Sequence, residues 1–130
     1  MSETLGLRRY SDDRGHLVAV ASDTDVPFDI RRVFWIYGNT AQRPRAGHAH
    51  QMLTELIVCV SGRCEATIED ASGVRRVTLD RPDSGVLLPP LTWIDLTDFS
   101  TDCVLLVLAD GDYNPEGVIT DRARIRAATI

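Results

Sequence analysis

The sequence predicts an all-β protein, built as a single β-sandwich or β-barrel domain with a short helix near its C-terminus. Three observations lead there: short β-branched segments recur along the chain, turn signals separate them, and the length suits one core. The 130 residues, 44% of them hydrophobic, can enclose one core but leave no room for a second. We therefore expect a single domain over residues 1–130.

The expected strands are apolar runs of five to seven residues, rich in Val, Ile, Thr and aromatic side chains. Turn residues between them include Ser61-Gly62 and the segments 70–73, 82–85 and 114–115. Only the tail after Gly117 has the composition of a helix. The eight runs are 16–21, 31–37, 55–60, 64–69, 75–79, 85–89, 93–97 and 103–109.

Composition excludes several classes of function. The net charge of -5 disfavours a nucleic-acid surface, which depends on a basic stripe. No apolar stretch is long enough to span a membrane, and the first residues lack the apolar run of a secretory signal, so we expect a cytoplasmic protein. Cys59, Cys64 and Cys103 lie in apolar runs without CxxC spacing, which indicates reduced core residues.

One segment carries residues suited to chemistry. After His48 and His50, four intervening residues lead to Glu55 and six more lead to Gly62, and this HxHx4Ex6G spacing resembles the first cupin motif. Side chains two apart on a strand share a face, so both histidines can point into one cavity. A cupin is a jelly-roll β-barrel, which agrees with the all-β pattern.

The second cupin motif usually supplies a further histidine, and its place here falls in the segment 85–95. Counting from Pro90, Asp95 stands where that histidine would be. If a divalent metal were bound, its ligands would therefore be His48, His50, Glu55 and Asp95. We expect no metal, because the usual ligand set is not preserved in type.

Beyond these motifs, much of the chain between residues 10 and 113 resembles the sugar 3,4-ketoisomerase family, also called WxcM-like. The most distinctive match is the string Asp98-Phe-Ser-Thr-Asp-Cys-Val104. The other matching pieces are 13–19, 27–33, Pro44-Arg45 before the His48-Ala49-His50 string, 58–62 and Trp93.

The resemblance implies a homodimer with exchanged N-terminal strands that acts on a dTDP-linked 4-keto-6-deoxyhexose without metal or other cofactor. It also implies that the two histidines transfer protons. This sequence differs from the family at two positions. Glu55 stands where members usually carry Gln, and Ile94 stands where a basic residue usually follows the tryptophan. The second position is linked to the stereochemistry of the product.

A 3,4-ketoisomerase removes the proton on C3, passes through an enediolate and returns a proton to C4. Neutral histidine suits this exchange near neutral pH. We expect His48 to be the base and His50 its partner, although the two roles can be reversed. Arg45 and Tyr37 are the candidate donors to the enediolate oxygen; the alternative for Tyr37 is an aromatic residue of the core or rim.

Four further residues are candidates for substrate binding. Arg14 and Arg32 are expected to bind the diphosphate, unless they are merely solvated strand residues. Trp93 can stack on the base or sugar, or else pack in the core. Asp95 shares the face of Trp93, where it would orient a histidine or bind a sugar hydroxyl, or else be an exposed acid.

Two other functions compete with the ketoisomerase. A dTDP-sugar 3,5-epimerase also removes a proton beside the carbonyl, but returns a proton to the same carbon. A metal-binding cupin, either an enzyme or a sensor of small ligands, would use the same histidines as ligands.

Overall fold

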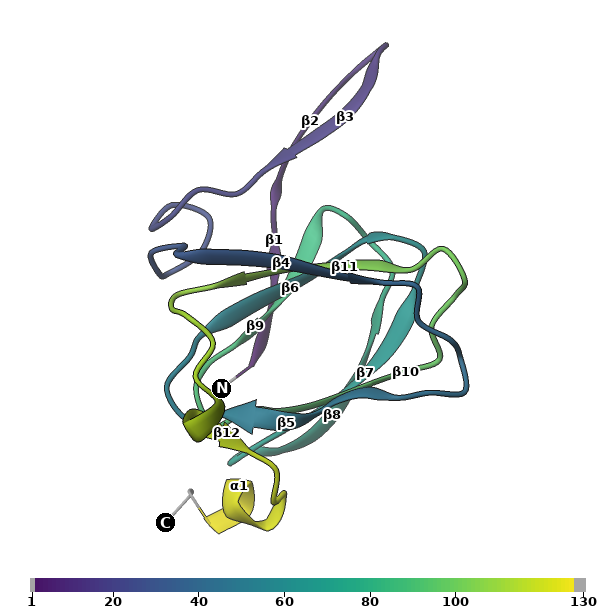
Figure 1. Ribbon diagram of the computed structural model, residues 1–130. Coiled ribbons are helices and arrows are strands. Elements are labelled where there is room, and N and C mark those ends of the chain that lie inside the picture. Colours follow the sequence, from purple (N-terminus) through teal and green to yellow (C-terminus); the bar gives the residue numbers. More distant parts are fainter. Residues whose placement is uncertain (1, 128–130) are drawn as a thin grey trace.

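The computed structural model describes residues 2–127 and consists almost entirely of β-strands (Figure 1). Two five-stranded sheets pack face to face, and a separate two-stranded hairpin projects from them. The strands are β1 Glu3–Gly6, β2 Arg8–Asp12, β3 Gly15–Ala19, β4 Arg32–Tyr37, β5 Arg45–His50, β6 Glu55–Ser61, β7 Cys64–Asp70, β8 Gly73–Leu79, β9 Ser84–Leu88, β10 Trp93–Thr97, β11 Val104–Ala109 and β12 Val118–Ile119.

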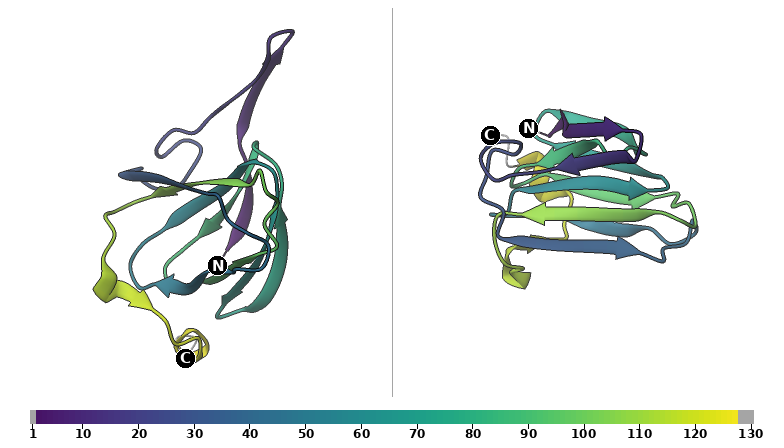
Figure 2. Two further views of the ribbon diagram at one scale, coloured as in Figure 1. Left: turned by 45° about the vertical axis from the view of Figure 1, so that its right-hand side comes forward. Right: turned by 90° about the horizontal axis from the view of Figure 1, so that it is seen from above.

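The first sheet has the strand order β1-β9-β6-β11-β4, and the second has the order β12-β5-β10-β7-β8. All pairings within them are antiparallel. The right-hand view of Figure 2 looks down on the first sheet, with β4 at one edge. The expected jelly-roll fold is confirmed, as an open sandwich of two sheets rather than a closed barrel.

The main core fills the space between the sheets. Its buried members come from strands of both sheets, for example Ile57 and Leu105 from the first and Ile68 and Leu96 from the second. Strand β6 is buried on both of its faces, because Leu56 and Val58 on its outer side pack under Val26 and Phe28 of the β3–β4 connection. Double coverage explains why this strand reads as an unbroken apolar run.

The outer face of the second sheet is covered by the C-terminal segment. After the 3₁₀ turn η1 Pro115–Gly117, strand β12 pairs with β5, and helix α1 Ala123–Ala127 follows. Ile119 and Ile125 pack there against Ala49 and Trp93. The expected terminal helix is thus present, and the part of that prediction at residues 128–130 lies outside the described residues.

The structure contains all eight predicted strands and four more that the patterns did not single out as strand runs: β1, β2, β5 and β12. The three cysteines are free and buried, as predicted. Over residues 2–127, no helix has the length and apolar character needed to cross a membrane.

Candidate active site

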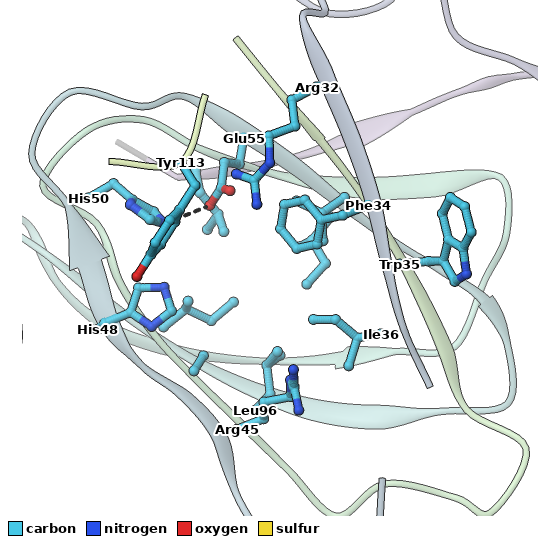
Figure 3. Close-up of a pocket in the computed structure, with 15 residues that line it drawn as sticks. Arg32, Phe34, Trp35, Ile36, Arg45, His48, His50, Glu55, Leu96 and Tyr113 are labelled. Atoms are coloured by element: carbon cyan, nitrogen blue, oxygen red, sulfur yellow. Dashed lines mark ion pairs between the residues drawn. The ribbon is translucent and has the colours of Figure 1, made fainter. Parts of the chain in front are cut away.

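A cavity of about 300 Å³ opens at one end of the sandwich, between the two sheets (Figure 3). This volume lies at the lower end of the range for small-molecule sites. Most of the lining is apolar, and its polar groups come from β4, β5, the start of β6 and the loop after β11. The lining residues are Arg32, Phe34, Trp35, Ile36, Arg45, Ala46, His48, His50, Glu55, Ile57, Leu88, Ile94, Leu96, Val107 and Tyr113.

The two histidines of the motif point into this cavity together, as predicted. Their ring centroids lie 4.9 Å apart, with the planes inclined at 79° in an edge-to-face arrangement. A bulge in β5 precedes them: Ala46 and Gly47 both have positive φ, 70° and 69°, where β5 changes register against β10. The bulge fits a glycine at this position, since glycine takes up positive φ without steric cost.

Glu55, the first residue of β6, lies at the buried end of the cavity beside His50. Its Oε1 atom is 3.6 Å from His50 Nε2, and both side chains are about 90% buried, with 10% and 11% exposed. Burial raises the pKa of Glu55 to about 7, although Arg32 opposes this and Asp110 adds to it. The contact therefore joins two groups that are costly to ionise in this environment.

Burial also lowers the pKa of His50 to about 4, and the positive charges of a protonated His48 and of Arg32 lower it further. His50 is consequently neutral at physiological pH, and its contact with Glu55 is not an ion pair there. A neutral imidazole has one donor and one acceptor nitrogen, so it can both accept and donate protons to a sugar.

Two arginines reach the cavity from opposite sides. Arg32 comes from β4, and its guanidinium lies 4.5 Å from the ring centre of Phe34 and 5.7 Å from that of Tyr113. Arg45 comes from the start of β5. The cavity thus combines two imidazoles with two permanent cations, which suits an intermediate that carries negative charge on oxygen.

Tyr37 does not line the cavity, contrary to the prediction. Side chains alternate along β4, and Arg32, Phe34 and Ile36 point inward, so Tyr37 points outward with 70% of its surface exposed. The alternative was an aromatic residue of the core or rim, and the side chain is too exposed to belong to the core. A role as donor to the intermediate does not fit this geometry.

Trp93 and Asp95 share a face, as predicted, but it is the outer face of the second sheet. Trp93 is buried in the cluster under α1, and its indole Nε1 donates to Asp95 Oδ2 at 3.1 Å. Asp95 also lies 3.6 Å from Arg122 Nη1. Core packing, the alternative, therefore describes Trp93, and neither residue lines the cavity as a candidate for substrate binding would.

The same orientation removes Asp95 from the proposed metal ligands. Ile94, not Asp95, pairs with His48 across the strands and presents its side chain to the cavity. Among residues 2–127, no group of three or more His, Cys, Asp or Glu side chains is arranged to hold a metal ion.

Arg14 lies at the turn of the β2–β3 hairpin, outside the cavity of its own chain. Its side chain is 86% exposed and pairs with Asp12. Arg32 is the only one of the two candidate diphosphate ligands that lines the described cavity.

Phe34, Tyr113 and the aliphatic residues of the cavity wall, such as Leu88, line the cavity but were not singled out in the sequence. The alternation of β4 contains the signal for Phe34, because it lies two residues from Arg32. Tyr113 lies in a loop between β11 and η1, and no local pattern indicates that this loop folds back over the cavity.

A jelly-roll sandwich with a histidine pair in its inner cavity defines the class of protein, a cupin. The family model described as "FdtA: WxcM-like, C-terminal" matches residues 2–129. The chain is 35% identical over 113 residues to the TDP-4-oxo-6-deoxy-alpha-D-glucose-3,4-oxoisomerase of Aneurinibacillus thermoaerophilus, covering 87% of this chain and 81% of that one. The chain belongs to the WxcM-like family.

Solved structures agree with this assignment. The TDP-quinovose 3,4-ketoisomerase WlaRB of Campylobacter jejuni is 32% identical, with a TM-score of 0.92 and 97% of each chain covered. The rmlC epimerase of Mycobacterium tuberculosis is 17% identical, with a TM-score of 0.76 over 90% of this chain and 66% of that one. The second likeness extends to the fold alone.

Proposed function

We propose that the protein is an isomerase that moves the carbonyl of a dTDP-linked 4-keto-6-deoxyhexose from C4 to C3. The observation that carries this proposal is the pair of imidazoles 4.9 Å apart inside a largely apolar cavity. Two groups at this spacing can serve neighbouring carbon and oxygen atoms of one sugar. The family relatives named as 3,4-oxoisomerase and 3,4-ketoisomerase support the same reaction.

In this proposal His48 takes the proton from C3 and returns it to C4, so that His48 begins and ends neutral. The hydroxyl proton on O3 passes to O4. The C3–C4 double-bond electron pair of the enediolate then takes up the proton at C4, while an electron pair of O3 forms the new carbonyl at C3. His50 is the partner that acts on the two oxygens. No redox cofactor is needed, because the electron pair of the C3–H bond stays within the sugar.

Arg45 and Arg32 stabilise the enediolate in place of the predicted Tyr37, since both line the cavity. A positioned donor in a water-poor site contributes about 3 kcal/mol to lowering the barrier. The guanidinium of Arg32, which lies over Phe34, would also bind the diphosphate.

We also propose that the protein forms a homodimer with exchanged N-terminal strands. The β2–β3 hairpin projects from the sandwich (Figure 2). Every residue of β2 is exposed, and Tyr10 and Leu17 are large hydrophobic residues exposed on the hairpin. Edge strand β4 presents a second open apolar surface through Trp35 and Tyr37. Pairing hairpins between subunits would cover both surfaces and could carry Arg14 to the cavity of the neighbour.

The reaction is tested by incubating the purified protein with dTDP-4-keto-6-deoxyglucose and following the sugar carbons by NMR. We expect the C4 carbonyl signal to be replaced by a C3 carbonyl. Epimers at C3 or C5 with the carbonyl still at C4 would instead identify an epimerase and refute the proposal.

Metal content distinguishes the proposed isomerase from the third candidate function, that of a metal-binding cupin. We expect full activity in protein that has been dialysed against a chelator. Stoichiometric iron, manganese or zinc, together with activity that is lost on chelation and restored by that metal, would refute the metal-independent mechanism.

A further inference from the structure

Glu55 is a buried carboxyl group that lies directly beside the imidazole of His50. The charged and titratable groups that face it are His48 and His50 from β5, Arg32 from β4 and Asp110 after β11. Tyr113 completes the cavity from its loop, whereas β9 and β10 contribute apolar side chains, among them Leu88 and Ile94, and the uncharged Thr92 lies just before β10. No guanidinium lies within ion-pair distance of the carboxyl group in the described part of the chain.

The geometry makes the two ring nitrogens of His50 unequal. Nε2 lies 3.6 Å from Glu55 Oε1, slightly beyond hydrogen-bond length, and such contacts tighten when a substrate binds. Nδ1 makes no hydrogen bond with any described residue, and the His50 side chain lines the cavity. In a neutral imidazole, the partner of one nitrogen determines which nitrogen carries the proton.

We propose that Glu55 is a positioning residue, which holds neutral His50 in the tautomer with its proton on Nδ1. This inference rests on the proposed function. A protonated Glu55 donates its O–H to Nε2, and Nδ1–H is then free to donate a hydrogen bond to the enediolate oxygens. An ionised Glu55 would instead accept a hydrogen bond from Nε2–H, and the bare Nδ1 would repel the enediolate.

The protonation states that this arrangement needs exist together in one pH range. The pKa of Glu55 is raised to about 7, so its carboxyl group is protonated below that pH. The pKa of His50 is lowered to about 4, so its ring is neutral above that pH. Between these values the carboxylic acid can donate and the imidazole can accept, and the arrangement is lost as the pH rises through 7.

The first test is spectroscopic and needs no substrate. Nitrogen-15 NMR of the full chain with labelled histidine distinguishes the two tautomers, and the His50 signals are assigned by their loss in His50→Asn. We expect an Nδ1–H tautomer at pH 6 that converts to Nε2–H as the pH passes about 7. One unchanging tautomer from pH 5.5 to 8.5 would overturn the proposal, whatever reaction the protein catalyses.

The second test uses Glu55→Gln, which keeps the shape of the side chain and cannot ionise. The amide N–H can donate to Nε2 at every pH. With a pKa of about 7, wild-type kcat should fall by up to roughly 30-fold between pH 6 and pH 8.5, whereas Glu55→Gln should keep its kcat over that range. The effect should appear in kcat rather than in KM, because the hydrogen bond strengthens in the intermediate.

Glu116→Gln is the matched control, because it makes the same change on an exposed carboxyl group in η1, and it should keep the wild-type pH profile. If Glu55→Gln shows the same alkaline decline as the wild type, Glu55 does not position His50. If no variant or wild-type sample forms a 3-keto sugar at any pH, the proposed function fails, and the tautomer measurement still decides the role of Glu55.

Discussion

At the scale of single residues, burial away from water determines the charge states of the groups in the site. Burial lowers the pKa of His50 to about 4 and raises that of Glu55 to about 7, so both groups favour their neutral forms. Permanent charge enters the cavity only through guanidinium groups among the described lining residues, Arg32 and Arg45. Negative charge that develops on a bound sugar would therefore meet cations across a poorly hydrated space.

Arg45→Met should lower kcat by about 100-fold, because it removes a donor to the enediolate while keeping much of the aliphatic volume. Tyr37→Phe, which removes a hydroxyl group outside the cavity, should leave steady-state kinetics unchanged. Equal losses in both variants, measured with circular dichroism as a check on folding, would show that the cavity described here is not the reacting site.

At the scale of strands, alternation was enough to predict that His48 and His50 share a face, because both stand on β5 after its bulge. Alternation was not enough to predict which face of β10 meets the cavity. Trp93 and Ile94 are both buried, one on each face of the sheet, so apolar character could not indicate which face met the cavity. The helix and β12 that cover Trp93 come from a distant part of the chain, and local patterns do not report such coverage.

β4 illustrates the same limit. Its inward side carries Phe34 and Ile36 and its outward side carries Trp35 and Tyr37, so both sides read as apolar. The pattern of the strand alone therefore cannot tell which apolar side is buried in the core and which is exposed. The eight strand runs were predictable because turn residues separate them; seven of them belong to the two packed sheets, and the run at 16–21 forms β3 of the hairpin.

The β6–β7 turn offers a prediction at this scale. Gly62 has φ of 69°, and a Cβ atom there would lie 2.4 Å from Ser100 Oγ and 2.7 Å from the Cys103 backbone nitrogen. Gly62→Ala should therefore lower the free energy of unfolding by roughly 3 kcal/mol, through both backbone strain and overlap.

Gly38→Ala is the control, since Gly38 has a similar φ of 73° but open space around it. It should cost only about 1 kcal/mol. Denaturant unfolding of both variants checks the comparison, and equal losses would mean that contacts around the turn play no part.

At the scale of the whole molecule, the sandwich leaves two apolar surfaces uncovered, on the β2–β3 hairpin and on the outer side of β4. An exchanged dimer would cover both and bring Arg14 of one chain toward the cavity of the other. Arg14 would then bind the diphosphate in the ground state and the transition state alike.

Arg14→Ala should accordingly raise KM about tenfold, with kcat nearly unchanged, because it removes one charge-assisted contact that does not strengthen during the reaction. Arg63→Ala, at the β6–β7 turn, is a control that should leave both constants unchanged. Analytical ultracentrifugation should give the mass of a dimer for both variants. A monomeric wild type, or an unchanged KM in Arg14→Ala, would contradict the proposed exchange.

The measurement closest to the central claim follows exchange of the C3 proton with deuterated solvent by NMR, in the wild type and in His48→Asn and His50→Asn. With His48 as the base, His48→Asn should fold and bind dTDP but lose both turnover and exchange at C3. His50→Asn should also lose the 3-keto product, while C3 exchange remains measurable because the enediolate forms and reverts. Exchange lost in His50→Asn and kept in His48→Asn would reverse the two roles, and wild-type turnover in both variants would contradict proton transfer by the histidine pair.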